Sequence, residues 1–213
     1  MLGVQKVERK PTATAREELA RIISMVVHPV LFPLVALGIT LYVRSDDSVG
    51  ETARDLGLAL ALTTLPIAVL VGVQVLRGKW TDLDVSVRRQ RYALYPFGIA
   101  CMAALAVSYA RLNAPQVAVQ SAVALMLANV VNGLVNFVYK VSAHATGAAA
   151  SAALLWLALP YLSLAVVASI AALLVGWSRV ALHRHTRGQV LLGWAVGVAS
   201  MVAAIRVPLP WGL

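Results

Sequence analysis

The chain has 213 residues, of which 60% are hydrophobic and 13% are charged, and its mean hydropathy is +0.80. Soluble globular domains are about 45–50% apolar and about 25% charged, so this composition excludes that class and indicates a protein with several membrane spans. The formal net charge is +9, but the cations are dispersed along the chain, which argues against a nucleic-acid-binding surface.

Residues 1–21 carry several charges and lack the apolar region of a secretory signal peptide, so we expect a basic N-terminal arm there. Residues 22–213 are expected to form a single transmembrane domain. A membrane-spanning helix needs about 20 mainly apolar residues. On this basis the predicted spans are 22–43, 55–76, 93–110, 117–138, 145–159, 161–177 and 188–205.

The stretch 145–177 is open to two interpretations. As one helix it would be about 50 Å long at 1.5 Å per residue, which exceeds a hydrocarbon core of about 30 Å. Because Pro160 divides the stretch nearly in half, we favour a hairpin of two short helices over one kinked, tilted helix. The predicted fold is therefore an all-α, polytopic transmembrane helical bundle with about six to seven spans.

The distribution of cations predicts the orientation of the bundle. With seven spans, 14 of the 18 Lys and Arg residues fall on the side that holds the N-terminal arm. The positive-inside rule places that side in the cytoplasm. We therefore expect an integral protein of a bacterial or archaeal cytoplasmic membrane, with its N-terminus in the cytoplasm.

Three polar loops follow the even-numbered spans and are expected on this same side: 77–92, 139–144 and 178–187. They contain arginines, lysines and histidines in a chain that is otherwise largely apolar. Arginine and lysine suit a polyanionic group, and histidine adds proton transfer or nucleophilic chemistry near neutral pH. The loops therefore predict a site for an anion such as a phosphate group.

Other polar residues have simpler explanations. In the segment TDLDV, Asp82 and Asp84 are expected to pair with Arg88 or Lys79 more readily than to hold a metal ion. His28 and His183 are expected at the membrane interface or in solvent. The asparagines of the fourth span recur at helical spacing, which favours hydrogen bonds between helices and leaves open a role in a substrate groove. These residues are Asn129, Asn132 and Asn136.

The loop 178–187 and the residues after it resemble the type 2 phosphatidic acid phosphatase superfamily, which also includes vanadium haloperoxidases. The third motif of that family is SRxxxxxHxxxD. Here Ser178-Arg179 is followed after five residues by His185, and the position of the final Asp is taken by Gln189. Since residues 185 and 189 are four apart, they share one face of a helix, and the Gln189 carbonyl could accept the Nδ1–H of His185.

The other two family motifs are matched less closely. PSGH has the counterpart Ser142-Ala143-His144, so the resemblance covers roughly residues 140–193. KxxxxxxRP is poorly kept, and Tyr92 stands where the family has Pro. The candidate cations in its place are Lys79, Arg88 and Arg91, of which we favour Arg91.

The resemblance implies a role for each residue of the site. His185 would be the nucleophile that forms a phosphohistidine, His144 the general acid, and Gln189 the group that orients His185. The implied phosphate-binding residues are Arg179, Ser142, Lys79, Arg88, Arg91 and Lys140. No metal or other cofactor is implied.

The sequence therefore favours a membrane-embedded, metal-independent phosphatase that hydrolyses a phosphomonoester or diphosphate of a lipid, such as a polyprenyl-linked or phospholipid phosphate. The alternative is a catalytically weak or inactive lipid-phosphate binding or transport protein, because Gln189 would not stabilise an imidazolium as a carboxylate does. A transferase that uses the TDLDV carboxylates with Mg²⁺ is the weakest hypothesis. The expected partners are the lipid phosphate and the membrane, and the sequence indicates no oligomeric state.

Overall fold

The structure is a computed structural model that describes residues 14–28, 31–44 and 49–206, and in these residues it contains helices and no strand. A π-helical segment, η1 (Leu60–Thr64), joins two of the helices, and a 3-10 turn, η2 (Arg88–Gln90), leads into a third. The α-helices are α1 (Ala15–Val26), α2 (Leu31–Arg44), α3 (Val49–Ala59), α4 (Leu65–Leu76), α5 (Arg91–Arg111), α6 (Gln116–Val135), α7 (Ala143–Ala158), α8 (Leu162–Ala181) and α9 (Arg187–Arg206).

The predicted all-α membrane bundle is confirmed. In the described residues, five helical segments are long and apolar enough to cross a membrane: Val49–Leu76, Arg88–Arg111, Gln116–Val135, Leu162–Ala181 and Arg187–Arg206. Helix α7 is a shorter apolar helix, and α1 with α2 would make a sixth span if the two count as one. The span count is thus close to the six or seven predicted from the sequence.

The first predicted span, 22–43, is wrong as a single helix. Helix α1 ends at Val26 and α2 begins at Leu31, and the two helices differ in direction by 46°. The sequence has Pro29 in this interval, and proline cannot donate to the helical hydrogen-bond ladder. Helix α1 begins at a capping box formed by Thr14 and Glu17, so the expected boundary of the N-terminal arm at residue 21 lies within a helix.

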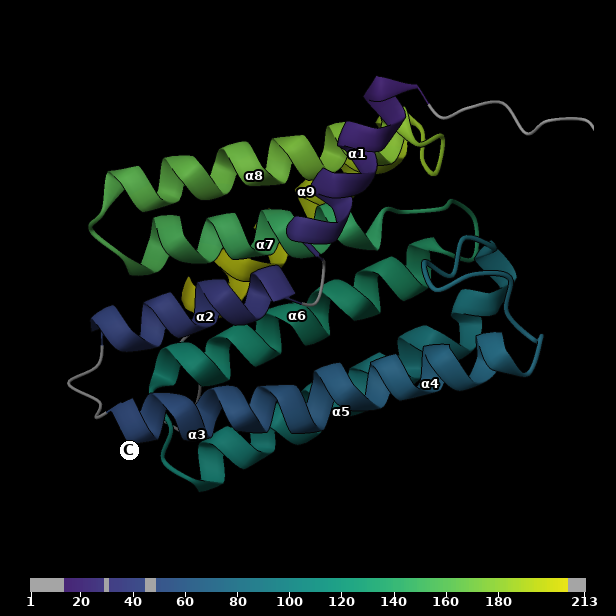
Figure 1. Ribbon diagram of the computed structural model, residues 1–213. Coiled ribbons are helices and arrows are strands. Elements are labelled where there is room, and N and C mark those ends of the chain that lie inside the picture. Colours follow the sequence, from purple (N-terminus) through teal and green to yellow (C-terminus); the bar gives the residue numbers. More distant parts are fainter. Residues whose placement is uncertain (1–13, 29–30, 45–48, 207–213) are drawn as a thin grey trace, which may run out of the picture.

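The stretch 145–177 forms two helices, and the alternative of one kinked helix is wrong. Leu159 is extended at the end of α7, as expected for a residue that precedes proline, and α8 begins at Leu162. The two helices run side by side in Figure 1 and are joined by a hydrogen bond of 2.9 Å from Trp156 Nε1 to Ser169 Oγ. This hairpin brings the end of α8 back to the start of α7.

Helix α7 lies at the centre of the bundle, in contact with α2, α6, α8 and α9 (Figure 1). It is rich in alanine and mostly buried, so its neighbours approach closely. The approach of α9 depends on Gly193 and Gly197, which are four residues apart and face α7. A Cβ on Gly193 would lie 2.7 Å from the carbonyl oxygen of Ser142, and one on Gly197 would overlap the carbonyl oxygen of Thr146.

Substitution of Gly197 by alanine should therefore separate α7 from α9. We expect Gly197→Ala to lower the thermal stability in detergent, by an amount typical of overpacked cores, about 1–3 kcal/mol. Gly72→Ala is the matched control, because a Cβ on Gly72 of α4 meets nothing within 4 Å. Equal melting temperatures for the two variants would contradict this account of the α7–α9 contact.

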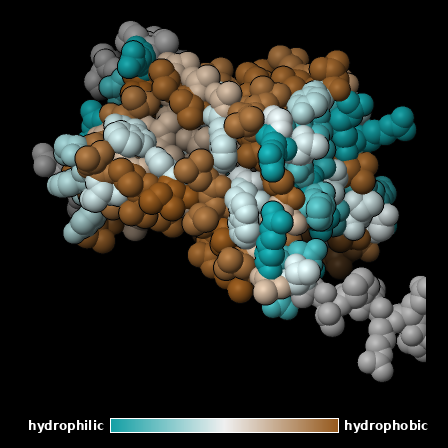
Figure 2. Space-filling view, turned by 90° about the horizontal axis from the view of Figure 1, so that it is seen from above, coloured by the Kyte–Doolittle hydropathy of each residue, from teal (hydrophilic) through white to brown (hydrophobic). Residues whose placement is uncertain are grey.

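The three polar loops gather at one end of the bundle, on the right in Figure 1. Figure 2 shows hydrophilic residues concentrated toward this end, beside a broad hydrophobic surface. Contacts join the loops: Lys140 Nζ donates to the Arg184 carbonyl at 2.9 Å, and Arg184 Nη1 donates to Ser86 Oγ at 3.1 Å. The prediction that these loops meet on one face is confirmed.

Candidate active site

His185 lies between α8 and α9, where the chain turns after the end of α8. Its backbone N–H donates to the Arg179 carbonyl at 3.1 Å, and its side chain is 6% exposed. Its Nδ1 lies 2.9 Å from Gln189 Oε1 in the first turn of α9, which is the contact predicted for residues four apart on a helix. The same Oε1 accepts the backbone N–H of Thr186 at 3.3 Å, which identifies it as the amide oxygen.

This arrangement fixes the tautomer of His185. Because Gln189 Oε1 is an acceptor, Nδ1 must carry the proton, and Nε2 keeps its lone pair. Burial, together with the positive charges of Arg91 and Lys140, lowers the pKa of His185 to about 3. A neutral imidazole with a free Nε2 is the form that can act as a nucleophile.

The protonation state of His185 can be measured directly. A pKa lowered from 6.5 to about 3 means that the ring stays neutral as the pH falls through the range in which free histidine becomes charged. We expect the ¹⁵N resonances of His185 to remain those of a neutral ring at pH 5, with assignment by comparison to His185→Asn. A titration midpoint near 6.5 would contradict the environment described for this residue.

His144 occupies the first turn of α7, on the other side of the cluster. The helix is capped by Ser142, whose Oγ accepts the N–H of Ala145 at 3.3 Å and whose own N–H donates to the Gln189 carbonyl at 3.2 Å. The start of α7 is thereby tied to the start of α9, which carries Gln189. The ring of His144 makes an edge-on contact with His28, at 6.4 Å between centroids.

Arg179, near the end of α8, is 2% exposed and is the most constrained cation of the cluster. Its Nη1 donates to Ser24 Oγ of α1 at 3.1 Å, and its Nη2 donates to Asp84 Oδ2 at 2.9 Å. Its Nε is buried and has no hydrogen-bond partner in the part of the chain that the structure describes. A buried donor without a partner suits an anionic ligand.

Arg91 and Lys140 are, with Arg179, the cations that lie nearest to His185. Arg91 is 4% exposed, and its guanidinium donates to the carbonyls of Val85 at 2.7 Å and Val141 at 2.8 Å. Lys140 is half-buried, and burial with the charges of Arg91 and Arg179 lowers its pKa. Both cations are charged neighbours of His185.

Two of the predicted phosphate-binding residues, Lys79 and Arg88, make no side-chain contact with this cluster in the part of the chain that the structure describes. Lys79 is exposed, and its carbonyl accepts a hydrogen bond from Gln90 Nε2 at 3.5 Å. The carbonyl of Arg88 accepts one from Asn136 Nδ2 at 3.2 Å. Of the three candidates for the first motif, only Arg91 therefore neighbours His185.

Asp84 is the residue of the cluster that the sequence did not reveal. The predicted pairing of Asp84 with Arg88 or Lys79 is wrong. The carboxylate instead pairs with Arg179 at 2.9 Å, and its Oδ1 lies 3.6 Å from His144 Nε2. Burial would raise the pKa of Asp84, but the charges of Arg179, His144 and Arg184 outweigh it and hold the pKa below its usual value. The described residues contain no group of three or more acidic, histidine or cysteine side chains that could hold a metal ion.

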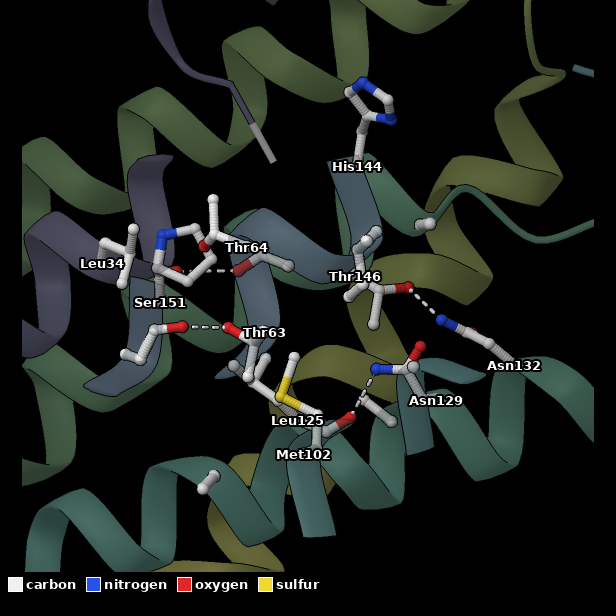
Figure 3. A pocket seen from close by; sticks show the side chains of 18 of the residues that line it. Leu34, Thr63, Thr64, Met102, Leu125, Asn129, Asn132, His144, Thr146 and Ser151 are labelled. Atoms are coloured by element: carbon white, nitrogen blue, oxygen red, sulfur yellow. Dashed lines mark hydrogen bonds between the residues drawn. The ribbon is translucent and has the colours of Figure 1, made fainter. Parts of the chain in front are cut away.

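A cavity of about 410 Å³ extends from this cluster into the bundle. Asp84, Arg91 and His144 line its polar end, and most of its remaining wall is apolar. Figure 3 shows His144 at one end and Met102 and Leu125 at the other. The π-helical segment η1 contributes Thr63 and Thr64 to the wall, and π-helical segments are frequent at functional sites.

Of the three asparagines, Asn132 makes the predicted contact between helices, whereas Asn129 donates to the Leu125 carbonyl of its own helix at 2.8 Å. Asn132 Nδ2 donates to Thr146 Oγ1 of α7 at 3.2 Å, as Figure 3 shows, and Asn136 reaches the loop before α5. Asn129 and Asn132 also line the cavity, so the alternative that they face a substrate groove agrees with the structure.

Comparison with known families supports the assignment made from the motifs. Residues 132–212, which contain α7, α8 and α9, match the sequence model of the PAP2 superfamily. The match covers less than half of the chain. The match indicates phosphatase-type chemistry on phosphate esters and includes His144, Arg179, His185 and Gln189. No curated protein and no solved structure matches the chain.

The PAP2 match begins after α5, so Asp84 and Arg91 lie outside it. The structure nevertheless brings both residues to the histidines of the matched segment. The loop before α5 is therefore part of the same site, although the family comparison does not extend to it.

Proposed function

We propose that this PAP2 protein is a membrane-embedded phosphatase that releases phosphate from a lipid phosphate through a phosphohistidine at His185. The observation that carries the proposal is the neutral His185 with its free Nε2, fixed by Gln189 and surrounded by Arg91, Lys140 and Arg179. Cations of this kind stabilise the charge that develops on a transferring phosphoryl group.

The site and the cavity together indicate the substrate class. The polar cluster suits a phosphate group, and the cavity, within the range of about 300–1,000 Å³ usual for ligand pockets, suits an apolar tail. Because Asp84, Arg91 and His144 line the end of the cavity next to the cluster, one molecule with a phosphate head and a hydrocarbon tail can occupy both.

The proposed reaction has two steps. His185 Nε2 attacks phosphorus, the bond from phosphorus to the ester oxygen breaks, and His144 gives its proton to the departing oxygen. Water then attacks the phosphohistidine, His144 takes up a proton from the water, and the P–N bond breaks to release phosphate and neutral His185. No step requires a metal ion, because the arginines and Lys140 supply the positive charge.

The orientation of the protein is also a proposal. The side that holds the site carries most of the Lys and Arg residues, so the positive-inside rule places the site at the cytoplasmic face of the membrane. The substrate would then approach from the cytoplasmic leaflet, with its headgroup at the level of the loops.

Release of inorganic phosphate from farnesyl monophosphate tests the proposal. The purified protein in detergent micelles should release phosphate in the presence of EDTA, and the rate should fall at least about a hundredfold in His144→Ala, since the leaving oxygen would lose its proton donor. Undiminished release by His144→Ala, or release that EDTA abolishes, would contradict the mechanism.

Gln189 favours a second candidate function, a protein that binds lipid phosphates without hydrolysing them efficiently. A neutral amide orients His185 but does not stabilise the imidazolium that forms when phosphohistidine breaks down. Gln189→Asp separates the two candidates. If the protein is an enzyme, the wild type should release phosphate at a measurable rate. If it is a binding protein, the wild type should bind the lipid without hydrolysing it, and hydrolysis should appear only in Gln189→Asp.

A further inference from the structure

Asp84 stands at the junction between the phosphate cluster and the cavity. Its two carboxylate oxygens face different partners, with Oδ2 at 2.9 Å from Arg179 Nη2 and Oδ1 at 3.6 Å from His144 Nε2. It also lines the polar end of the cavity, opposite the apolar walls. A lipid with its tail in the cavity and its phosphate in the cluster would therefore place the segment between them beside Asp84 and His144.

The backbone next to Asp84 holds the carboxylate in this place. Val85 has a φ of +47°, a left-handed conformation that is strained for a β-branched residue. It is kept there because its side chain is buried against Val71 and Trp80 and its carbonyl accepts a hydrogen bond of 2.7 Å from Arg91 Nε. Strain held by surrounding contacts is typical of functional loops.

The charges of the inner site leave room for one phosphate group. In the free site, with both histidines neutral, Arg91, Lys140 and Arg179 contribute three positive charges and Asp84 one negative charge, which leaves a net charge of two; the exposed Arg184, 3.9 Å from Asp84, is not counted in this inner set. A phosphomonoester carries about 1.5 to 2 negative charges near neutral pH, so it balances this site. A second phosphate group would bring negative charge in excess.

We propose that Asp84 is a specificity residue that makes this site select lipid monophosphates over lipid diphosphates. The inference rests on the proposed phosphatase function. In a monophosphate the segment beside Asp84 is the ester oxygen and the first carbons of the tail, which carry no charge. In a diphosphate that segment is the second phosphate, and its charge is repelled by the carboxylate; such repulsive elements are a general source of specificity.

Farnesyl monophosphate and farnesyl diphosphate share one tail and differ only in this segment. We expect the wild-type protein to have a kcat/KM at least about tenfold higher for the monophosphate. Asp84→Asn should lower this ratio by about tenfold, mainly by lowering KM for the diphosphate, because the amide keeps the shape and removes the charge. Asp84→Glu, which keeps the charge, should retain the preference for the monophosphate.

Asp82→Asn is the matched control. Asp82 is two residues away, contacts Ser86 and lies 4.0 Å from the exposed Arg184, so its loss removes the same charge outside the junction. We expect it to leave the monophosphate-to-diphosphate ratio within about twofold of wild type. An unchanged ratio in Asp84→Asn, or a wild-type preference for the diphosphate, would overturn the proposal.

A binding measurement keeps this test separate from the test of the function. Inorganic phosphate should raise the melting temperature of the wild-type protein more than pyrophosphate does, and Asp84→Asn should reverse that order. Failure to hydrolyse either farnesyl substrate would contradict the proposed function, and the thermal shifts would then decide the role of Asp84. Equal shifts by the two anions in both proteins would overturn the selection by Asp84.

Discussion

Replacement of His185 by asparagine should abolish phosphate release, with a loss of at least about a thousandfold in kcat. The reason is chemical: the neutral ring presents Nε2 as the nucleophile, and an asparagine amide cannot form the phosphorylated intermediate. The measurement is phosphate release from farnesyl monophosphate at saturating substrate. Binding of the lipid should survive, because Arg179 and Arg91 remain.

His183→Asn is the matched control for this prediction. His183 is exposed and has a φ of +53°, a conformation that asparagine adopts readily, so the variant should keep its fold and its activity within about threefold. If both variants retain activity, His185 is not the nucleophile. If both variants lose activity, the loss in His185→Asn is caused by a changed conformation of the loop and not by removal of the nucleophile.

Substitution of Arg179 by lysine should lower kcat/KM by about 10²- to 10³-fold, although it conserves the charge. The guanidinium donates to Ser24 Oγ through Nη1 and to Asp84 through Nη2, and its buried Nε stays available for a phosphoryl oxygen. A lysine ammonium is a single point charge and cannot reproduce this planar set of donors. The loss should therefore appear in kcat as well as in KM.

Arg184→Lys serves as the control for Arg179→Lys. Arg184 is half-exposed, and its contacts to the two aspartates are long, at 3.9 and 4.0 Å. Exposed ion pairs of this kind contribute little, so the same substitution should change kcat/KM by less than about fivefold. An Arg179→Lys variant that retains near wild-type activity and melting temperature would show that the planar set of guanidinium donors is not needed.

The arrangement of the spans could be predicted because it depends on local properties. Apart from the first span, which is broken into α1 and α2, hydropathy located the membrane-spanning helices to within about six residues, and Pro160 located the turn of the α7–α8 hairpin. The contact between His185 and Gln189 could also be predicted from their spacing of four residues, although His185 lies in the turn before α9 and not on the helix itself. Each of these features is determined by residues that are close in sequence.

The contacts of the loop before α5 could not be predicted in the same way. Asp84 reaches Arg179, which is 95 residues away, because the packing of Val85 with Trp80 and its bond to Arg91 fix a strained backbone. Sequence reasoning assigned the aspartate to cations of its own loop, where proximity in the chain is greatest. The long-range pairing depends on how the loop packs on α8, and no local pattern encodes that.

The π-helical segment and the cavity were also missed. The stretch Val49–Leu76 is long enough to span the membrane as one helix, and the residues of η1 have no distinctive composition. The cavity has walls from several helices, including α2, α5, α6 and α7, so its existence depends on tertiary packing. The asparagines on α6 were the one sequence signal that pointed to it.

Chemical trapping of the intermediate tests the central claim most directly. The protein is mixed with ³²P-labelled farnesyl monophosphate, quenched in alkali, in which phosphohistidine is stable, and mapped by peptide mass spectrometry. The account predicts a phosphoryl group on His185 in the wild-type protein and none in His185→Asn. Turnover by a wild-type protein that carries no label, or a label on another residue, would contradict it.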